Sequence, residues 1–108
     1  MSRVEAALAE LVAAIIDSSE YREYSLQRNL MHQYPDLKAE IDNYRQEKFE
    51  LQSSASSDEL FDKMDELARK SEELRRNPMV GSFLDAELDF CRMIQQVNNV
   101  IVEAVDFE

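Results

Sequence analysis

Residues 77–106 read NPMVGSFLDAELDFCRMIQQVNNVIVEAVD, and they contain the longest helical pattern in the chain. Asn77 is a good N-cap residue and Pro78 a good first-turn residue, so a helix is predicted to begin here. Only Gly81 would weaken this helix before about Asp106, and in the first turn the cost is small. The stretch therefore predicts a helix of about 29 residues, which at ~1.5 Å per residue is roughly 43 Å long.

A mostly apolar stripe follows one side of this predicted helix. Its members recur at helical spacing, and they are Val80, Phe83, Leu84, Glu87, Phe90, Ile94, Val97, Asn98, Ile101 and Val105. A compact globule of this chain length has a radius of gyration near ~13 Å and a diameter of roughly 34 Å, which is shorter than the helix. The stripe should therefore extend beyond its own core, and a second copy of the chain is the simplest cover. We predict that the stripe forms the core and the seam of a homodimer, or that a partner protein takes the place of the second copy.

Two polar residues interrupt this stripe. Glu87 lies between Phe83 and Phe90, where it either reaches solvent or pairs with an Arg or Tyr of a neighbouring helix. Alternatively, its carboxylate specifies how the helices dock. Asn98 invites the same interpretation, because a polar seam residue fixes the register of a coiled coil at a cost in stability. Both interpretations concern assembly rather than catalysis.

Four further segments show helical spacing of apolar residues, and they are residues 4–16, 18–33, 35–52 and 58–76. Tyr34-Pro35 marks one boundary, because proline suits a first helical turn. The serine-rich loop 53–57 is long enough to reverse the chain, and the 78–106 helix is expected to pack on the 58–76 helix. The sequence predicts an all-α fold, an antiparallel helical bundle of four to five helices in a single domain, residues 1–108.

Two of these boundaries have the spacing of a capping box. Asp17 precedes Glu20 by three residues, and Ser56 precedes Glu59 by the same interval. Around Asp17 a break, a kink and straight continuation of the helix are all compatible with the sequence.

The composition excludes several classes of protein. The chain has 108 residues, one Gly and one Cys, and a formal net charge of −11. One glycine argues against β-hairpins and Gly-rich phosphate loops, which need several residues with φ > 0. One cysteine, Cys91, excludes an internal disulfide and an intrachain Cys-rich metal site. The negative charge disfavours binding to a nucleic acid backbone.

The N-terminal region shows no targeting segment. The longest apolar run there, Leu11 to Ile16, is far shorter than the ~20 residues that cross a bilayer. We therefore expect a cytoplasmic protein without a membrane segment.

No pattern in the sequence indicates catalysis. His32 is the only histidine, so a nucleophile–base pair would have to combine it with Cys91 or a serine. A single histidine near a helix end is ordinarily a surface or capping residue. Cys91 lies mid-helix beside Phe90, where a small buried hydrophobe is expected. We predict no enzyme activity, no cofactor and no metal site.

Two other classes of function stay as alternatives. The first alternative is a direct RNA-binding module, which would use the tyrosines together with the basic patch at the end of the 58–76 helix. Against it, the tyrosines are expected in the core or an interface, and acidic residues alternate with the basic patch. These residues are Tyr21, Tyr24, Tyr34, Tyr44, Arg69, Lys70, Arg75 and Arg76. The second alternative is a metal- or iron–sulfur-binding sensor that uses Cys91 from two or more chains.

The C-terminal pattern resembles the signature of the YlbF/YmcA family of small bacterial helical proteins. The matching residues are Asn77-Pro78-Met79-Val80, Phe83, Ala86-Glu87, Phe90, Val97-Asn98 and Ile101. The first half agrees through Ala6 to Ile16, Ser19-Glu20-Tyr21 and Ile41 to Gln52. The resemblance covers nearly the whole chain.

This resemblance implies a bifurcated, coiled-coil-like fold that dimerises and has no enzymatic activity. Some family members resemble regulators in a ribonuclease-associated complex that processes messenger RNA and affects competence, sporulation and biofilm formation. Cysteines near the C-terminus of certain members hold iron–sulfur clusters. Cys91 stands alone within its helix and Glu108 ends the chain, so we do not expect a cluster, and the shorter YheA-like branch fits better. The expected function is that of a regulatory or adaptor protein acting through helix-mediated homo- and hetero-association.

Overall fold

The computed structural model describes residues 2–54 and 57–106, and these form five α-helices and no strand. The helices are α1 (Arg3–Asp17), α2 (Ser19–His32), α3 (Pro35–Ser54), α4 (Ser57–Arg75) and α5 (Pro78–Val105). The prediction of an all-α fold with a long C-terminal helix is confirmed, and α5 has 28 residues. Of the predicted loop 53–57, residues 53 and 54 end α3 and residue 57 begins α4, whereas residues 55 and 56 lie outside the described residues.

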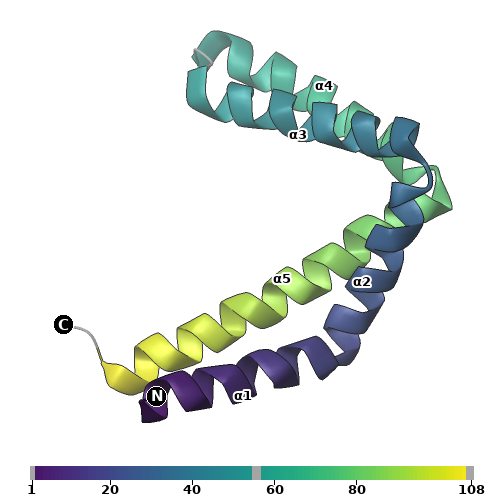
Figure 1. Cartoon of the computed structure of the whole chain (residues 1–108). Helices are drawn as coiled ribbons and strands as arrows, with labels where there is room; N and C mark the ends of the chain where they lie inside the picture. The colour runs from purple at the N-terminus through teal and green to yellow at the C-terminus, as the bar shows by residue number, and fades with distance from the viewer. Residues whose placement is uncertain (1, 55–56, 107–108) are drawn as a thin grey trace.

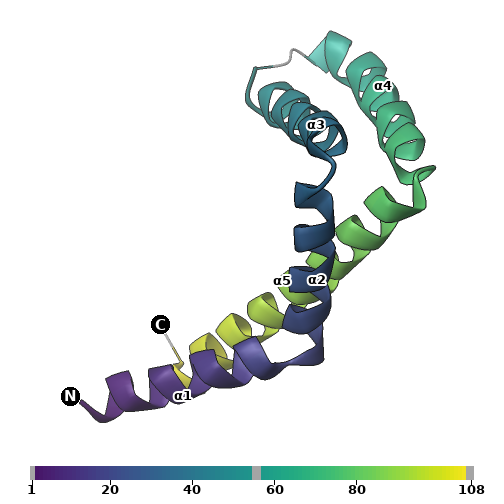
Figure 2. The ribbon, with the colours of Figure 1, turned by 45° about the vertical axis from the view of Figure 1, so that its right-hand side comes forward.

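The helices form a fork with two arms. In one arm α3 and α4 make an antiparallel hairpin, and in the other α1 and α2 run in the opposite direction to α5 (Figures 1 and 2). The radius of gyration is 18.0 Å and the extents are 50 × 40 × 19 Å, whereas a compact chain of this length has a radius near ~13 Å. The premise of a compact globule was therefore wrong, because the helices pack in pairs along two arms.

The junction of the two arms contains the core. Met31 of α2, Ile41 of α3, and Val80 and Phe83 of α5 form its buried cluster. Partly buried side chains pack around them, namely Tyr24, Leu37, Leu74, Met79 and Leu84. Because four helices contribute to one small cluster, the junction holds the two arms together.

The principal partner of α5 within the chain is α2. The expectation that it would pack on the 58–76 helix is corrected, because α4 contacts α5 less extensively and pairs mainly with α3. The reason is the turn around Asn77, where α4 leaves the line of α5 (Figure 1). Helical periodicity identified the apolar face of α5 without identifying the helix that covers it.

The end of α1 is a break in the helix. Ser18 has an extended backbone with ψ 152°, and its hydroxyl oxygen accepts a hydrogen bond from the Tyr21 N–H at 3.1 Å. The same hydroxyl donates to the Ile15 carbonyl at 2.6 Å. Ser18, rather than the expected Asp17, therefore caps α2, since one hydroxyl can serve the ends of both helices. The predicted capping residue Ser56 lies outside the described residues.

The start of α5 is the predicted Asn77 cap, whose side-chain oxygen accepts from the Met79 N–H at 3.0 Å. We expect Asn77→Ala to lower the free energy of unfolding by about 1 kcal/mol, because a helix N–H at the junction loses its acceptor. Urea denaturation followed by circular dichroism measures the loss. Ser2→Ala is the matched control, since Ser2 caps the outer end of α1 through the Glu5 N–H. Removing a cap at a fraying terminus should lower the free energy of unfolding by less than removing the Asn77 cap. Equal decreases in the two variants would therefore contradict this prediction.

Candidate association surface

The predicted stripe on α5 is buried at one end and open at the other. Val80 is fully buried and Phe83 is 8% exposed. The next stripe members are partly buried, and they are Leu84, Glu87, Phe90, Ile94 and Val97. The last members, Asn98, Ile101 and Val105, are exposed. The stripe therefore serves as core only at the junction, where side chains of α2, α3 and α4 pack against it.

An aromatic cluster fills the contact between α2 and α5. The Tyr24 ring lies 5.3 Å from that of Phe90 and 6.1 Å from that of Phe83, measured between centroids. Tyr21 meets Phe90 edge-on at 5.5 Å. Such pairs stabilise beyond the area they bury. Two of the predicted tyrosines thus pack in the helix contact as expected, whereas Tyr34 is exposed.

Glu87 forms an ion pair with Arg45 of α3, so the expected pairing with an arginine of another helix is confirmed. The Arg45 guanidinium also lies 5.9 Å from the centroid of the Phe83 ring, within the range of a cation–π contact. Arg45 thereby connects the hairpin arm to α5.

The first helix has an apolar face and no buried residue. A row at four-residue spacing, Val4, Leu8, Val12 and Ile16, is between 45% and 77% exposed. Side chains at this spacing lie on one face of a helix. Sequence reasoning recognised this apolar face but did not include it among the interface residues, although the exposed row now makes it a candidate.

The last turns of α5 are also open. Val100, Ile101, Val102 and Val105 are 48% to 59% exposed. Consecutive residues point about 100° apart on a helix, so α5 is apolar here on more than one side. Figures 1 and 2 place this part of α5 at the same end of the molecule as α1.

We call these eight side chains of α1 and α5 the terminal surface. Each of the eight is between 45% and 77% exposed. Exposed apolar side chains that gather in one region of a soluble protein are typical of an interaction site. The terminal surface is therefore the candidate functional site.

Cys91 is exposed, so the expectation that it would be buried was wrong. Its neighbour Phe90 faces α2, and a side chain one position along points about 100° away. His32 is exposed as well. Among the described residues no group of three or more His, Cys, Asp or Glu side chains is placed to hold a metal ion.

Two members of the basic patch, Lys70 and Arg75 of α4, form ion pairs with other helices. Lys70 donates to Glu47 of α3 at 2.6 Å, and Arg75 donates to Asp85 of α5 at 3.0 Å. The hydrogen bond to Glu47 raises the pKa of Lys70 above its ordinary value. These contacts connect the hairpin arm internally and to α5. A membrane-spanning helix is not found in the described part of the chain.

In the described residues, five helices in a fork, with a core at the junction and an open apolar end, define the class: an all-helical protein with two arms. The chain belongs to the YlbF/YmcA family, whose model, described as control of the competence regulator ComK, matches residues 4–106.

Two curated relatives carry the name UPF0342 protein. The one from Desulfitobacterium hafniense is 32% identical over 102 residues, covering 89% of this chain and 79% of the relative. The one from Caldicellulosiruptor bescii is 22% identical over 101 residues, covering 92% of this chain and 85% of the relative. No solved structure matches the chain significantly. The family description fits a regulatory role, and neither it nor the relatives' names states an enzymatic activity.

Proposed function

We propose that this protein is a non-catalytic, cytoplasmic regulatory or adaptor protein that works through helix-mediated association, first with a second copy of itself. The observation that carries the proposal is α1, a largely apolar helix that buries no residue within its own chain. The family description supports a role in developmental regulation. The resemblance of the sequence to the family also suggests RNA processing, through a ribonuclease-associated complex.

A second copy fits the terminal surface for two reasons. All eight of its members are uncharged, so the net charge of −11 on each copy does not oppose contact at its centre. In addition, α1 and the end of α5 run in opposite directions at one end of the molecule (Figure 1). Two such antiparallel helix pairs related by a twofold axis would form a four-helix arrangement, the usual geometry for covering apolar helix faces.

Sedimentation equilibrium of the full chain at micromolar concentration tests the proposed dimer. We expect a mass near twice the 12.6 kDa of the chain. A stable species of single-chain mass across the micromolar range would overturn the homodimer. Predicted effects of substitutions on the same equilibrium are given in the Discussion.

A further inference from the structure

One face of the α3–α4 hairpin is hollowed. This hairpin is the arm of the fork that does not contain the terminal surface. A cavity of about 380 Å³ lies between the two helices near the junction, with apolar walls from Leu37, Tyr44, Leu74 and Val80. A second cavity of about 320 Å³ continues toward the tip of the hairpin. Glu47 and Lys70 line both cavities, and their ion pair lies where the two cavities adjoin. We call them together the hairpin groove.

The edges of the hairpin groove are acidic. Six glutamates line it, and they are Glu40, Glu47, Glu50, Glu59, Glu66 and Glu73. The two lysines in the lining, Lys63 and Lys70, lie in ion pairs with Glu59 at 3.7 Å and with Glu47 at 2.6 Å. The groove therefore has a formal net charge of −4 and an apolar floor.

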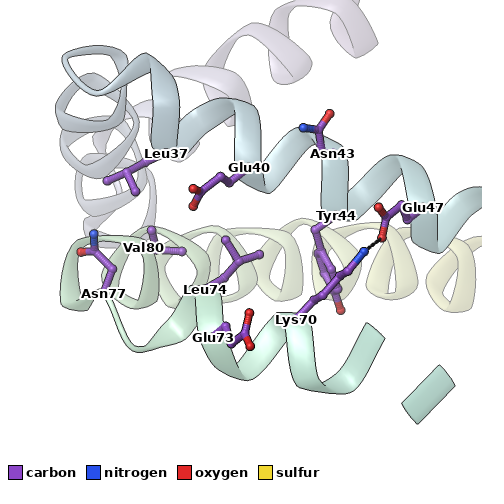
Figure 3. Close-up of a pocket in the computed structure, with 10 residues that line it drawn as sticks. All are labelled: Leu37, Glu40, Asn43, Tyr44, Glu47, Lys70, Glu73, Leu74, Asn77 and Val80. Carbon is purple, nitrogen blue, oxygen red and sulfur yellow. Dashed lines mark hydrogen bonds and ion pairs between the residues drawn. The ribbon is translucent and has the colours of Figure 1, made fainter. Parts of the chain in front are cut away.

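Two carboxylates flank the first cavity from opposite helices. In Figure 3, Glu40 of α3 points into the space between the helices, and Glu73 of α4 lies across that space, below Leu74. Within the described residues neither forms an ion pair with a cationic side chain, and both are exposed. The cavity therefore offers apolar walls for an alkyl stem and two carboxylates for a positive head group.

The acidic residues repeat at the heptad interval. Glu40 and Glu47 are seven residues apart on α3, and Glu59, Glu66 and Glu73 are seven apart on α4. Seven residues bring a helical side chain back to the same face after two turns. A third helix lying in the groove would therefore meet an acidic edge of roughly 21 Å on α4 and one of roughly 10 Å on α3.

The charge of the groove selects its occupant. A second copy of this chain carries a net charge of −11, and nucleic acid is a polyanion, so neither is complementary to these edges. A helix with an apolar stripe and flanking Lys or Arg residues is complementary to both the floor and the edges.

We propose that the hairpin groove binds an amphipathic, basic helix of a partner protein, with one Lys or Arg side chain entering the cavity between Glu40 and Glu73. The stem of that side chain packs on Leu37 and Leu74, and its charge is shared by the two carboxylates. This inference rests on the hetero-association part of the proposed function and is independent of the homodimer.

The test uses the full chain and a fluorescein-labelled synthetic helix of about 21 residues, or three heptads, of Leu and Lys in an amphipathic pattern. Fluorescence anisotropy at ~0.15 M salt, where long-range attraction is screened, measures the dissociation constant. We expect Glu40→Gln with Glu73→Gln to weaken binding about 10-fold or more. Glu10→Gln with Glu23→Gln, which removes the same charge from exposed sites on α1 and α2, should change it less than about twofold.

Three results would overturn the proposal. These are no binding of the peptide, equal weakening in the two double variants, or equal binding of a peptide with the same composition in scrambled, non-amphipathic order. Circular dichroism establishes that both variants keep their helices. In sedimentation, the Glu40→Gln, Glu73→Gln double variant should have the same oligomeric state as the unmodified chain. The proposal of a helix-binding groove and the proposal of a homodimer can therefore fail independently.

Discussion

Phe83→Ala is expected to remove about 3–5 kcal/mol from the free energy of unfolding, because it leaves a cavity in a core with few other members. The Phe83 side chain is 8% exposed and packs with Met31, Ile41 and Val80 at the junction of the arms. Domains of this size have a total stability of only ~5–15 kcal/mol. The substitution should therefore lower the midpoint of thermal unfolding by more than about 10 °C.

Phe61→Ala is the matched control for this prediction. Phe61 lies on α4 and is 74% exposed, so its truncation should change the free energy of unfolding by less than about 0.5 kcal/mol. Urea denaturation of both variants, at one fixed protein concentration, removes the contribution of any change in association. If the two truncations cost the same, the buried cluster at the junction is not the core that stabilises the fork.

Ile101→Asp is expected to raise the dissociation constant of the homodimer by a factor of about 100 or more. In the single chain Ile101 is 48% exposed, so an aspartate there remains hydrated and the fork should keep its helices. In the dimer the same carboxylate would be buried against apolar side chains without a partner, which costs several kcal/mol. Sedimentation equilibrium measures the shift from dimer to monomer.

Met64→Asp supplies the control for the dimer, because Met64 is similarly exposed but lies on the hairpin arm. It introduces the same charge and should leave the dissociation constant unchanged. Leu8→Asp tests the α1 side of the terminal surface and should act like Ile101→Asp. If neither Leu8→Asp nor Ile101→Asp changes the dissociation constant of the homodimer, a different face of the chain associates.

The candidate site was predictable from the sequence only in part. The α5 stripe was recognised, but its buried members Val80 and Phe83 serve the core and only its last turns are open. An arginine or tyrosine partner for Glu87 was foreseen, yet Arg45 is 42 residues away in the sequence and no local pattern connects the two. The row on α1 was visible as an apolar face, but its lack of burial depends on where α2 and α5 pass.

Local patterns in the sequence were sufficient to predict the helices and most of their ends. Helical spacing and helix-start residues such as Asn77 and Pro78 act over three or four residues, so a short stretch of sequence is enough to recognise them. The sequence did not predict that α2 rather than α4 covers α5, or which apolar faces stay open. Periodicity shows which face of a helix avoids water, whereas the helix that covers this face depends on contacts between residues far apart in the chain.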